Sequence, residues 1–240
     1  MNLDLLAIAA HPDDVELTCG GTMLKMAEAG YSTGIVDLTR GEMGTRGDER
    51  LRSREAAAAA RVLRVRHRES LGLPDARLAA DEPSKLAVAR AVRKLRPRCV
   101  ILPYWEARHP DHYTTSKLGY EGCFLAGLRR LAIDGAPFRP FKILYSLAFT
   151  RVKPTFVVDI TRQFERRARA IACFSSQFPR KARTKATRLD VFLATDRLAE
   201  QMEVLARLYG EMIGVRYGEG FLVRETLQVD DVVRLPVRSI

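Results

Sequence analysis

The sequence lacks any apolar run approaching the roughly 18 consecutive residues that a membrane-spanning helix needs. Its first apolar stretch contains Asp4 and follows no basic leader, which predicts a buried strand and not a signal peptide. We therefore expect a cytoplasmic protein that makes no membrane contact. The 240 residues are 47% apolar, enough for the core of one domain covering residues 1–240.

Cysteine is also sparse, and its spacing argues against two kinds of site. Cys19, Cys99, Cys123 and Cys173 lie far apart and form no CxxC pair, so we expect four buried free thiols and no disulfide framework. Cys19 lies near the first motif described below, where it could line a site. The sequence has neither GxGxxG nor a P-loop, so nucleotide binding has little support.

Acidic residues are outnumbered, and the net charge is +11. Nucleic-acid binding is one alternative this charge suggests, and it would show as affinity falling steeply with salt. The densest basic run, residues 180–185 within the basic stretch 180–188, has no interleaved aromatic residues. We interpret it as a solvated face that can concentrate an anionic substrate, and we expect no nucleic-acid partner.

Two short polar motifs each follow an apolar run. Ala10–Asp14 follows Leu5–Ala9, and Arg108–His112 follows Val100–Leu102. Proline cannot donate to a sheet ladder, so each strand is expected to end at its motif. Parallel sheets collect ligands at the carboxyl ends of strands, so we expect both motifs at one site. Either motif alone is most often a solvated turn, but the two together favour a functional site.

The residue types in these motifs suit a catalytic metal. His11, Asp14 and His112 supply two imidazoles and one carboxylate, which is a usual zinc ligand set that leaves a position open. Asp13 is adjacent to Asp14 and would point elsewhere, so it could face a bound water. His109 and Asp111 remain for proton transfer and orientation. His67, the fourth histidine, sits in the basic stretch Arg64–Arg68, which we expect to be solvated.

A second enzyme class shares this ligand set. Two histidines and one carboxylate also form the facial triad of non-haem Fe(II) oxygenases. The adjacent second carboxylate and the parallel α/β pattern count against this alternative, which dioxygen uptake would revive. A zinc site of this kind could also carry Fe(II) or another divalent metal in place of zinc.

The chain resembles the LmbE/PIG-L family of zinc-dependent N-deacetylases over nearly its full length. The paired motifs carry this resemblance: Ala10–Glu16 with Cys19–Thr22, and His109–His112. Further stretches resemble the bacillithiol-biosynthesis deacetylase branch: Asp37–Glu42, Gly44–Gly47, Arg52, Glu55-Ala56, Leu73–Asp75, Phe156–Ile160, Ser176–Phe178 and Tyr217–Phe221.

The resemblance implies a role for each matching position. One zinc ion per subunit would be held by His11, Asp14 and His112. Asp13 would be the general base, and Asp13 or protonated His109 would protonate the leaving nitrogen. Asp111 would orient His109.

The resemblance also implies a substrate, a small-molecule N-acetylglucosamine conjugate such as N-acetylglucosaminyl malate. Its carboxylates would suit Arg52 and Arg108. Related mycothiol-pathway enzymes carry an oxyanion-assisting tyrosine where this chain has Ala107, so Arg108 or another group would replace it. Another N-acetylglucosaminide, including a diacetylchitobiose-like sugar, stays open. A homo-oligomer, such as the hexamer of that branch, is expected, with apolar residues around 145–149 at an interface.

Strands and helices alternate along the chain, which predicts a three-layer, Rossmann-like α/β fold with a largely parallel sheet flanked by helices. Residues 44–48 could form a mobile loop over the site or an ordinary connection. Residues 143–149 and 155–160 are expected to extend the sheet as connected antiparallel strands. The other expected strands are 5–10, 33–38, 71–75, 99–102 and an extended 220–229. The expected helices are 22–29, 49–65, 84–95, 113–131, 161–174 and 189–209.

Overall fold

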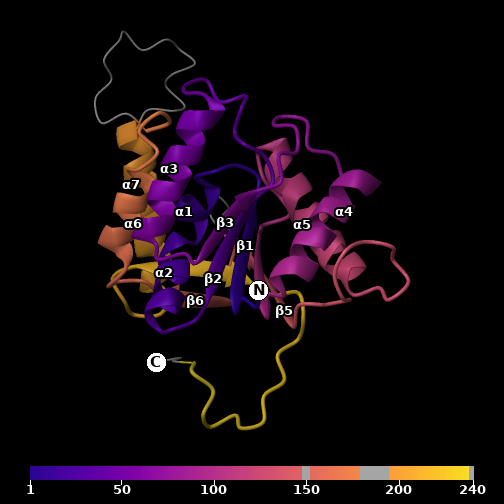
Figure 1. Cartoon of the computed structure of the whole chain (residues 1–240). Coiled ribbons are helices and arrows are strands. Elements are labelled where there is room, and N and C mark those ends of the chain that lie inside the picture. The colour runs from indigo at the N-terminus through magenta and orange to yellow at the C-terminus, as the bar shows by residue number, and fades with distance from the viewer. Residues whose placement is uncertain (148–151, 179–194, 238–240) are drawn as a thin grey trace.

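The computed structural model describes residues 1–147, 152–178 and 195–237. Within these residues a seven-stranded sheet has the order β3-β2-β1-β4-β5-β7-β6 (Figure 1). The strands are β1 Leu5–Ala9, β2 Thr33–Asp37, β3 His67–Ser70, β4 Cys99–Pro103, β5 Lys142–Ser146, β6 Phe156–Asp159 and β7 Gly218–Leu222. This is the largely parallel α/β sheet that the alternating pattern predicts.

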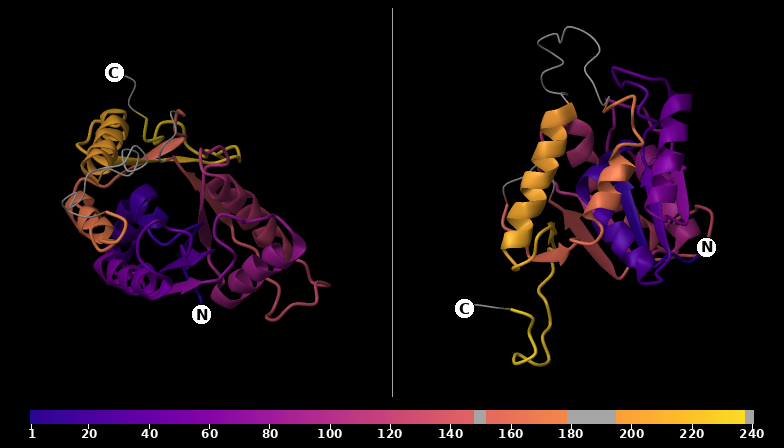
Figure 2. Two further views of the ribbon diagram at one scale, coloured as in Figure 1. Left: turned by 90° about the horizontal axis from the view of Figure 1, so that it is seen from above. Right: turned by 90° about the vertical axis from the view of Figure 1, so that its left-hand side faces the viewer.

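Strands β1 to β5 run parallel, and β1 and β2 are buried along their whole length. Helices cover both faces of such a sheet, which is why the sequences of the central strands β1 and β4 are continuously apolar instead of alternating. Figures 1 and 2 show α4 and α5 on one face and the other helices on the opposite side. The helices are α1 Asp14–Thr18, α2 Gly20–Glu28, α3 Glu49–Val62, α4 Glu82–Leu95, α5 Pro110–Ala126, α6 Phe164–Ile171 and α7 Thr195–Glu211.

The strand order reverses between β1 and β4, which are neighbours in the sheet although about ninety residues separate them in sequence. In doubly wound sheets this reversal opens a crevice at the carboxyl ends of the two strands. Both motifs lie there: residues 10–14 follow β1, and residues 108–112 follow β4. The fold therefore brings the two motifs together.

The expected connection of residues 143–149 and 155–160 as paired antiparallel strands is wrong. β7 lies between β5 and β6 and pairs antiparallel with both. The last strand therefore inserts between β5 and the edge strand β6, which periodicity within 143–160 cannot reveal because the pairing is non-local. Tyr145 and Leu147 are each 1% exposed, so they belong to the core and not to an interface. Phe149 lies outside the described residues.

Two local predictions also fail. Strand β3 covers His67–Ser70 and not residues 71–75. Within Arg64–Arg68, Arg64 and Arg66 are exposed as expected, but Arg68 is not. Arg68 is buried against the carboxylates of Asp37 and Glu16, with its guanidinium 2.7 and 2.6 Å from them. The basic run 180–188 lies outside the described residues. No helix of the described chain is long and apolar enough to cross a membrane.

Candidate metal and active site

The turn after β1 has an unusual backbone conformation. Asp13 has φ 128° and ψ −25°, a region that side-chain-bearing residues rarely occupy. Helix α1 begins at the next residue, and the His11 amide donates to Asp14 Oδ2 at 2.9 Å. The result is a tight turn in which Asp13 faces Arg52 while Asp14 faces His11 and His112, so the two carboxylates take separate directions as expected.

His11, Asp14 and His112 converge beyond the carboxyl ends of β1 and β4. His11 Nδ1 lies 3.3 Å from Asp14 Oδ2, and His112 Nε2 lies 3.2 Å from Asp14 Oδ1. One ligating atom from each residue lies within 4.8 Å of the other two. This donor set, with two imidazoles and one carboxylate in reach of one point, fits a divalent metal such as zinc.

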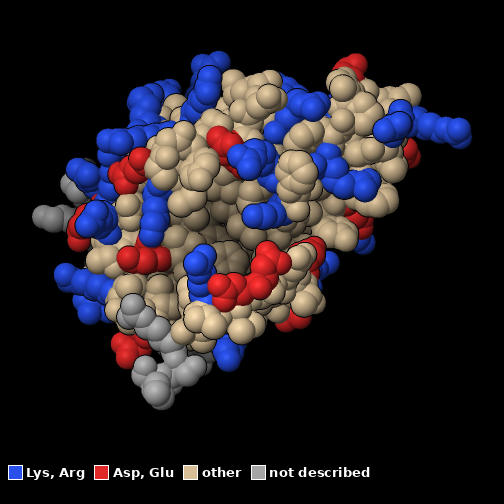
Figure 3. Space-filling model, turned by 90° about the horizontal axis from the view of Figure 1, so that it is seen from below, with Lys and Arg blue, Asp and Glu red and all other residues tan. Residues whose placement is uncertain are grey.

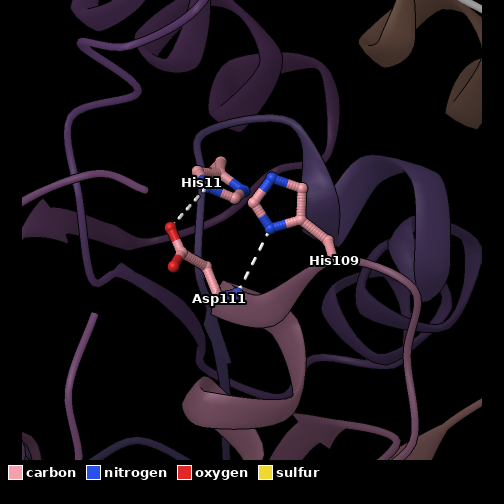
Figure 4. A group of neighbouring side chains, drawn as sticks. All are labelled: His11, His109 and Asp111. Carbon is pink, nitrogen blue, oxygen red and sulfur yellow. Dashed lines mark hydrogen bonds and ion pairs between the residues drawn. The ribbon is translucent and has the colours of Figure 1, made fainter. Parts of the chain in front are cut away.

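A second group of possible ligands, His11, His109 and Asp111, overlaps the first (Figure 4). Its members already have other partners. His109 is the N-cap of α5, and its Nδ1 accepts from the Asp111 amide at 3.2 Å. The Asp111 carboxylate accepts from the Ala76 amide at 2.8 Å and lies 3.3 Å from His11 Nε2. The first group is therefore the better metal site.

These contacts change the expected role of Asp111. Its carboxylate faces His11 and not His109, so the side chain does not orient His109. The orientation of His109 comes instead from the Asp111 backbone amide. Because Nδ1 of His109 accepts this bond, the proton of the neutral ring belongs on Nε2. Burial and the neighbouring His11 and His112 lower the pKa of His109, which favours that neutral form.

Asp75 is a site residue for which the sequence predicted no role. Its Oδ1 lies 3.0 Å from His11 Nε2, and its Oδ2 accepts from the Met43 amide at 2.8 Å. Asp75 follows Pro74, and the same Pro-Asp pair occurs in both motifs, as Pro12-Asp13 and Pro110-Asp111. That repetition was the available signal. Asp75 and Asp111 thus contact Nε2 of His11, and Nδ1 of His11 faces Asp14.

Arg52 lies beneath Asp13 and is only 3% exposed. Its Nη1 is 3.3 Å from Asp13 Oδ2, and its Nη2 donates to the Pro12 carbonyl at 2.7 Å. Burial raises the pKa of Asp13 to about 7, against the opposing charge of Arg52. The Arg52 guanidinium therefore holds the turn at Pro12 and Asp13 in place and opposes the rise in the pKa of Asp13. Its expected contact with substrate stays a prediction.

The other residues considered from the sequence lie apart from the metal-binding group. Arg108 is exposed on the loop between β4 and α5, and neighbouring Ala107 brings no polar side chain. Cys19 is buried in the apolar cluster beside Val15 and Met23, where burial raises the pKa of its thiol. Cys19 therefore belongs to the core and does not line the site.

The loop after β2 contacts the site residues. Glu42 Oε1 accepts from the Asp75 amide at 2.8 Å, which complements the Met43–Asp75 bond. Farther along the loop, Gln177 Nε2 donates to the Arg46 carbonyl at 2.7 Å. Glu42, Met43 and Arg46 therefore tie this loop to Asp75 and Gln177 by hydrogen bonds.

The charges of Asp14 and His11 depend on one another, as expected where a cation binds between them. Burial alone would raise the pKa of Asp14, but His112 and His11 hold it well below its usual range. Burial alone would lower the pKa of His11, but Asp14 and Asp75 raise it to about 11. A bound cation would replace the imidazole proton as the partner of these carboxylates.

Comparison with known proteins agrees with this geometry. The family model "PIG-L: GlcNAc-PI de-N-acetylase" matches residues 6–123. The chain is 30% identical over 228 residues to diacetylchitobiose deacetylase of Thermococcus kodakarensis, covering 90% of this chain and 81% of that protein. It is 26% identical to the probable N-acetyl-alpha-D-glucosaminyl L-malate deacetylase 2 of Bacillus anthracis, covering 74% and 82%. The crystal structure of the conserved protein TT1542 from Thermus thermophilus superposes with a TM-score of 0.85 at 38% identity, covering 95% and 98%.

These relatives identify the chain as a member of a deacetylase family with an α/β fold. The chain belongs to the PIG-L/LmbE family.

Proposed function

We propose that this protein is a metal-dependent hydrolase that removes the N-acetyl group from an N-acetylglucosamine conjugate. The observation that carries the proposal is the convergence of His11, Asp14 and His112 beside Asp13 at the strand-order reversal. Zinc is the metal we expect, one per subunit. When bound, it would supply Lewis acidity and make water a stronger nucleophile at neutral pH.

The remaining chemistry falls to this chain's own residues. Asp13, with a pKa near neutrality, accepts a proton from the attacking water and returns one to the leaving nitrogen. His109 presents its Nε2–H as a hydrogen-bond donor to the developing oxyanion. His109 would thus stabilise the oxyanion in place of the tyrosine that the mycothiol-pathway enzymes have where this chain has Ala107. Asp75 and Asp111 act as positioning residues by fixing the His11 ring.

For the substrate, we propose N-acetylglucosaminyl malate, as in bacillithiol biosynthesis, in a cytoplasmic protein. Arg108, exposed beside the motif, is the better candidate for a malate carboxylate, because Arg52 is buried beneath Asp13. A second candidate is diacetylchitobiose, which the 30% identity to the Thermococcus kodakarensis enzyme favours. Both substrates present the same acetamido group to the site.

The test is release of free amine by zinc-loaded protein from three substrates: N-acetylglucosaminyl malate, diacetylchitobiose and free N-acetylglucosamine. We expect kcat/KM to be highest for the malate conjugate and Arg108→Gln to lower it for that substrate alone. A higher kcat/KM for diacetylchitobiose would overturn N-acetylglucosaminyl malate as the proposed substrate but would agree with the proposed deacetylation. No amine from any of the three, with zinc bound, would contradict the proposed function.

A further inference from the structure

A large hollow lies at the edge of the sheet opposite the metal site, where β1, β4 and β5 begin. Its volume is ≈ 1160 Å³. Apolar side chains from four strands and from α5 line it: Leu5, Ile101, Ile143, Leu144, Phe156 and Phe124. Figure 3 shows this face from below, with a tan, uncharged recess bordered by Lys and Arg on several sides and by Asp and Glu on one. An apolar hollow of this extent on a surface indicates a binding site for an apolar partner.

The chain carries a matching segment, residues 227–237, which we call the arm. Six large apolar residues of the arm are exposed to solvent. Their exposed fractions are Leu227 61%, Val229 41%, Val232 78%, Val233 90%, Leu235 42% and Val237 64%. Val233, Leu235 and Val237 alternate with other residues, so they can present one apolar edge when extended. Six such side chains in one short segment are costly to leave in water.

The arm begins at the rim of the hollow and then leaves the body. Leu227 and Gln228 line the hollow. Beyond them, the hydrogen bonds described for residues 229–237 remain inside the segment, as between Val233 and Asp231 or Leu235 and Val232. Figure 1 shows the arm projecting away from the sheet and helices. An arm with this course reaches outward to another molecule and leaves its own hollow open.

Charge complements the apolar match. At the border of the hollow, Arg98, Arg139 and Lys142 outnumber Asp4 and Glu225, and Arg98 is paired with Asp4. The arm has the opposite excess, with Asp230 and Asp231 against Arg234. Opposite charges at the rim of an apolar contact favour the correct pairing and register. The hollow and the arm are therefore complementary in both apolar character and charge.

We propose that residues 229–237 of one copy dock in the hollow of a second copy of this chain. In a two-fold pair the exchange is reciprocal, so each copy gives its arm and receives the other. The contact lies on the face opposite the metal site, and it leaves the crevice free.

Light scattering with size-exclusion chromatography on the full chain, over a wide concentration range, tests this. The arm variant is Val233→Asp with Leu235→Asp, and the hollow variant is Phe141→Asp, whose side chain is 80% exposed and so not needed for folding. Val204→Asp, on α7 and 64% exposed, is the matched control. We expect the unmodified chain and the control to form a dimer or larger assembly, and both other variants to be monomers with unchanged circular dichroism.

A labelled peptide of residues 226–237 separates a second copy from the chain's own arm. We expect it to bind protein truncated after Gln228 and to bind at least tenfold more weakly when Phe141→Asp is added. An unmodified chain that stays monomeric at every concentration, even with the peptide bound, would overturn the exchange between copies. The proposal would also be overturned if the arm variant or the hollow variant had the same molecular mass in light scattering as the unmodified assembly.

Discussion

At the scale of single residues, the site is built around the backbone of Asp13. A side chain in this φ region costs about 1–3 kcal/mol and persists only where surrounding contacts hold it. Arg52 supplies two of them, to the Asp13 carboxylate and to the Pro12 carbonyl. The same guanidinium opposes the burial that raises the pKa of Asp13. Arg52 thus fixes both the position and the ionisation of the candidate base.

Replacing Arg52 should therefore shift the pH dependence of turnover. In Arg52→Met the favourable charge is lost, so the pKa of Asp13 rises further. A base must be deprotonated to act, so the acid limb of the kcat profile moves to higher pH. The profile of Arg54→Met, an exposed neighbour on α3, should not move. An unshifted acid limb in Arg52→Met would separate Arg52 from the ionisation of Asp13.

Asp75 should act through the metal site and not on the substrate. In Asp75→Asn, His11 loses one of the two carboxylates at Nε2. Loss of such a partner typically weakens metal binding by about 10–100-fold. Competition with a zinc chelator measures the change, and exposed Glu106→Gln is the control. Unchanged zinc affinity in Asp75→Asn would remove Asp75 from this role.

The sequence predicted that His11, Asp14 and His112 would lie together as a candidate metal site, but it did not predict all of their partners. His11, Asp14 and His112 were predictable because breakers end two apolar strands at polar motifs. The partners of His11 were not, because Asp75 and Asp111 meet it only through long-range folding. Arg68 was misjudged because a basic stretch has the same composition whether its charges are solvated or paired with buried carboxylates.

At the scale of elements, α5 carries Asp111 and His112, and it is held by close packing on α4. A Cβ added at Gly122 would lie 2.5 Å from Val88 Cγ1, and one at Gly119 would lie 2.3 Å from Leu102 Cδ2. The two helices and strand β4 therefore approach at positions where glycine leaves room. This spacing fixes where the start of α5 lies relative to β1.

Gly122→Ala tests that packing. Alanine favours a helix by about 1 kcal/mol over glycine, but overpacking a core typically costs about 1–3 kcal/mol. We expect net destabilisation, seen as a lower urea midpoint with unchanged slope. Lys117→Ala, 63% exposed on the same helix, should leave the midpoint nearly unchanged. A higher midpoint for Gly122→Ala would show that α4 and α5 are loosely packed there.

Most elements were predictable because their periodicity or their caps are local. Asp81 caps α4, and its side chain accepts from the Ser84 amide. The order of the last strands was not predictable, because β7 pairs with β5 and β6 across long sequence separations. Helix α1, only five residues long, gave no periodic signal.

At the scale of the whole molecule, the metal-binding group links the first strand to α5, and so it joins distant parts of the chain. A metal that binds the folded state stabilises it by mass action, by about 2.7 kcal/mol at one hundred times Kd. Zinc should therefore raise the melting temperature by about 5–10 °C in a chain of this size. Differential scanning calorimetry measures this, and His112→Ala should abolish most of the increase. Equal zinc stabilisation in His112→Ala would place the ion elsewhere.

The zinc content and turnover of Asp13→Asn test the proposed chemistry most directly. Asparagine has nearly the same shape and tolerates positive φ, so the fold and the ligands His11, Asp14 and His112 should persist. We predict full zinc content, measured by atomic absorption, and amine release slowed by about 10²–10⁴-fold. Glu106→Gln should keep both. Near-normal turnover by zinc-loaded Asp13→Asn would contradict the central claim that Asp13 is the base of a metal-dependent deacetylase.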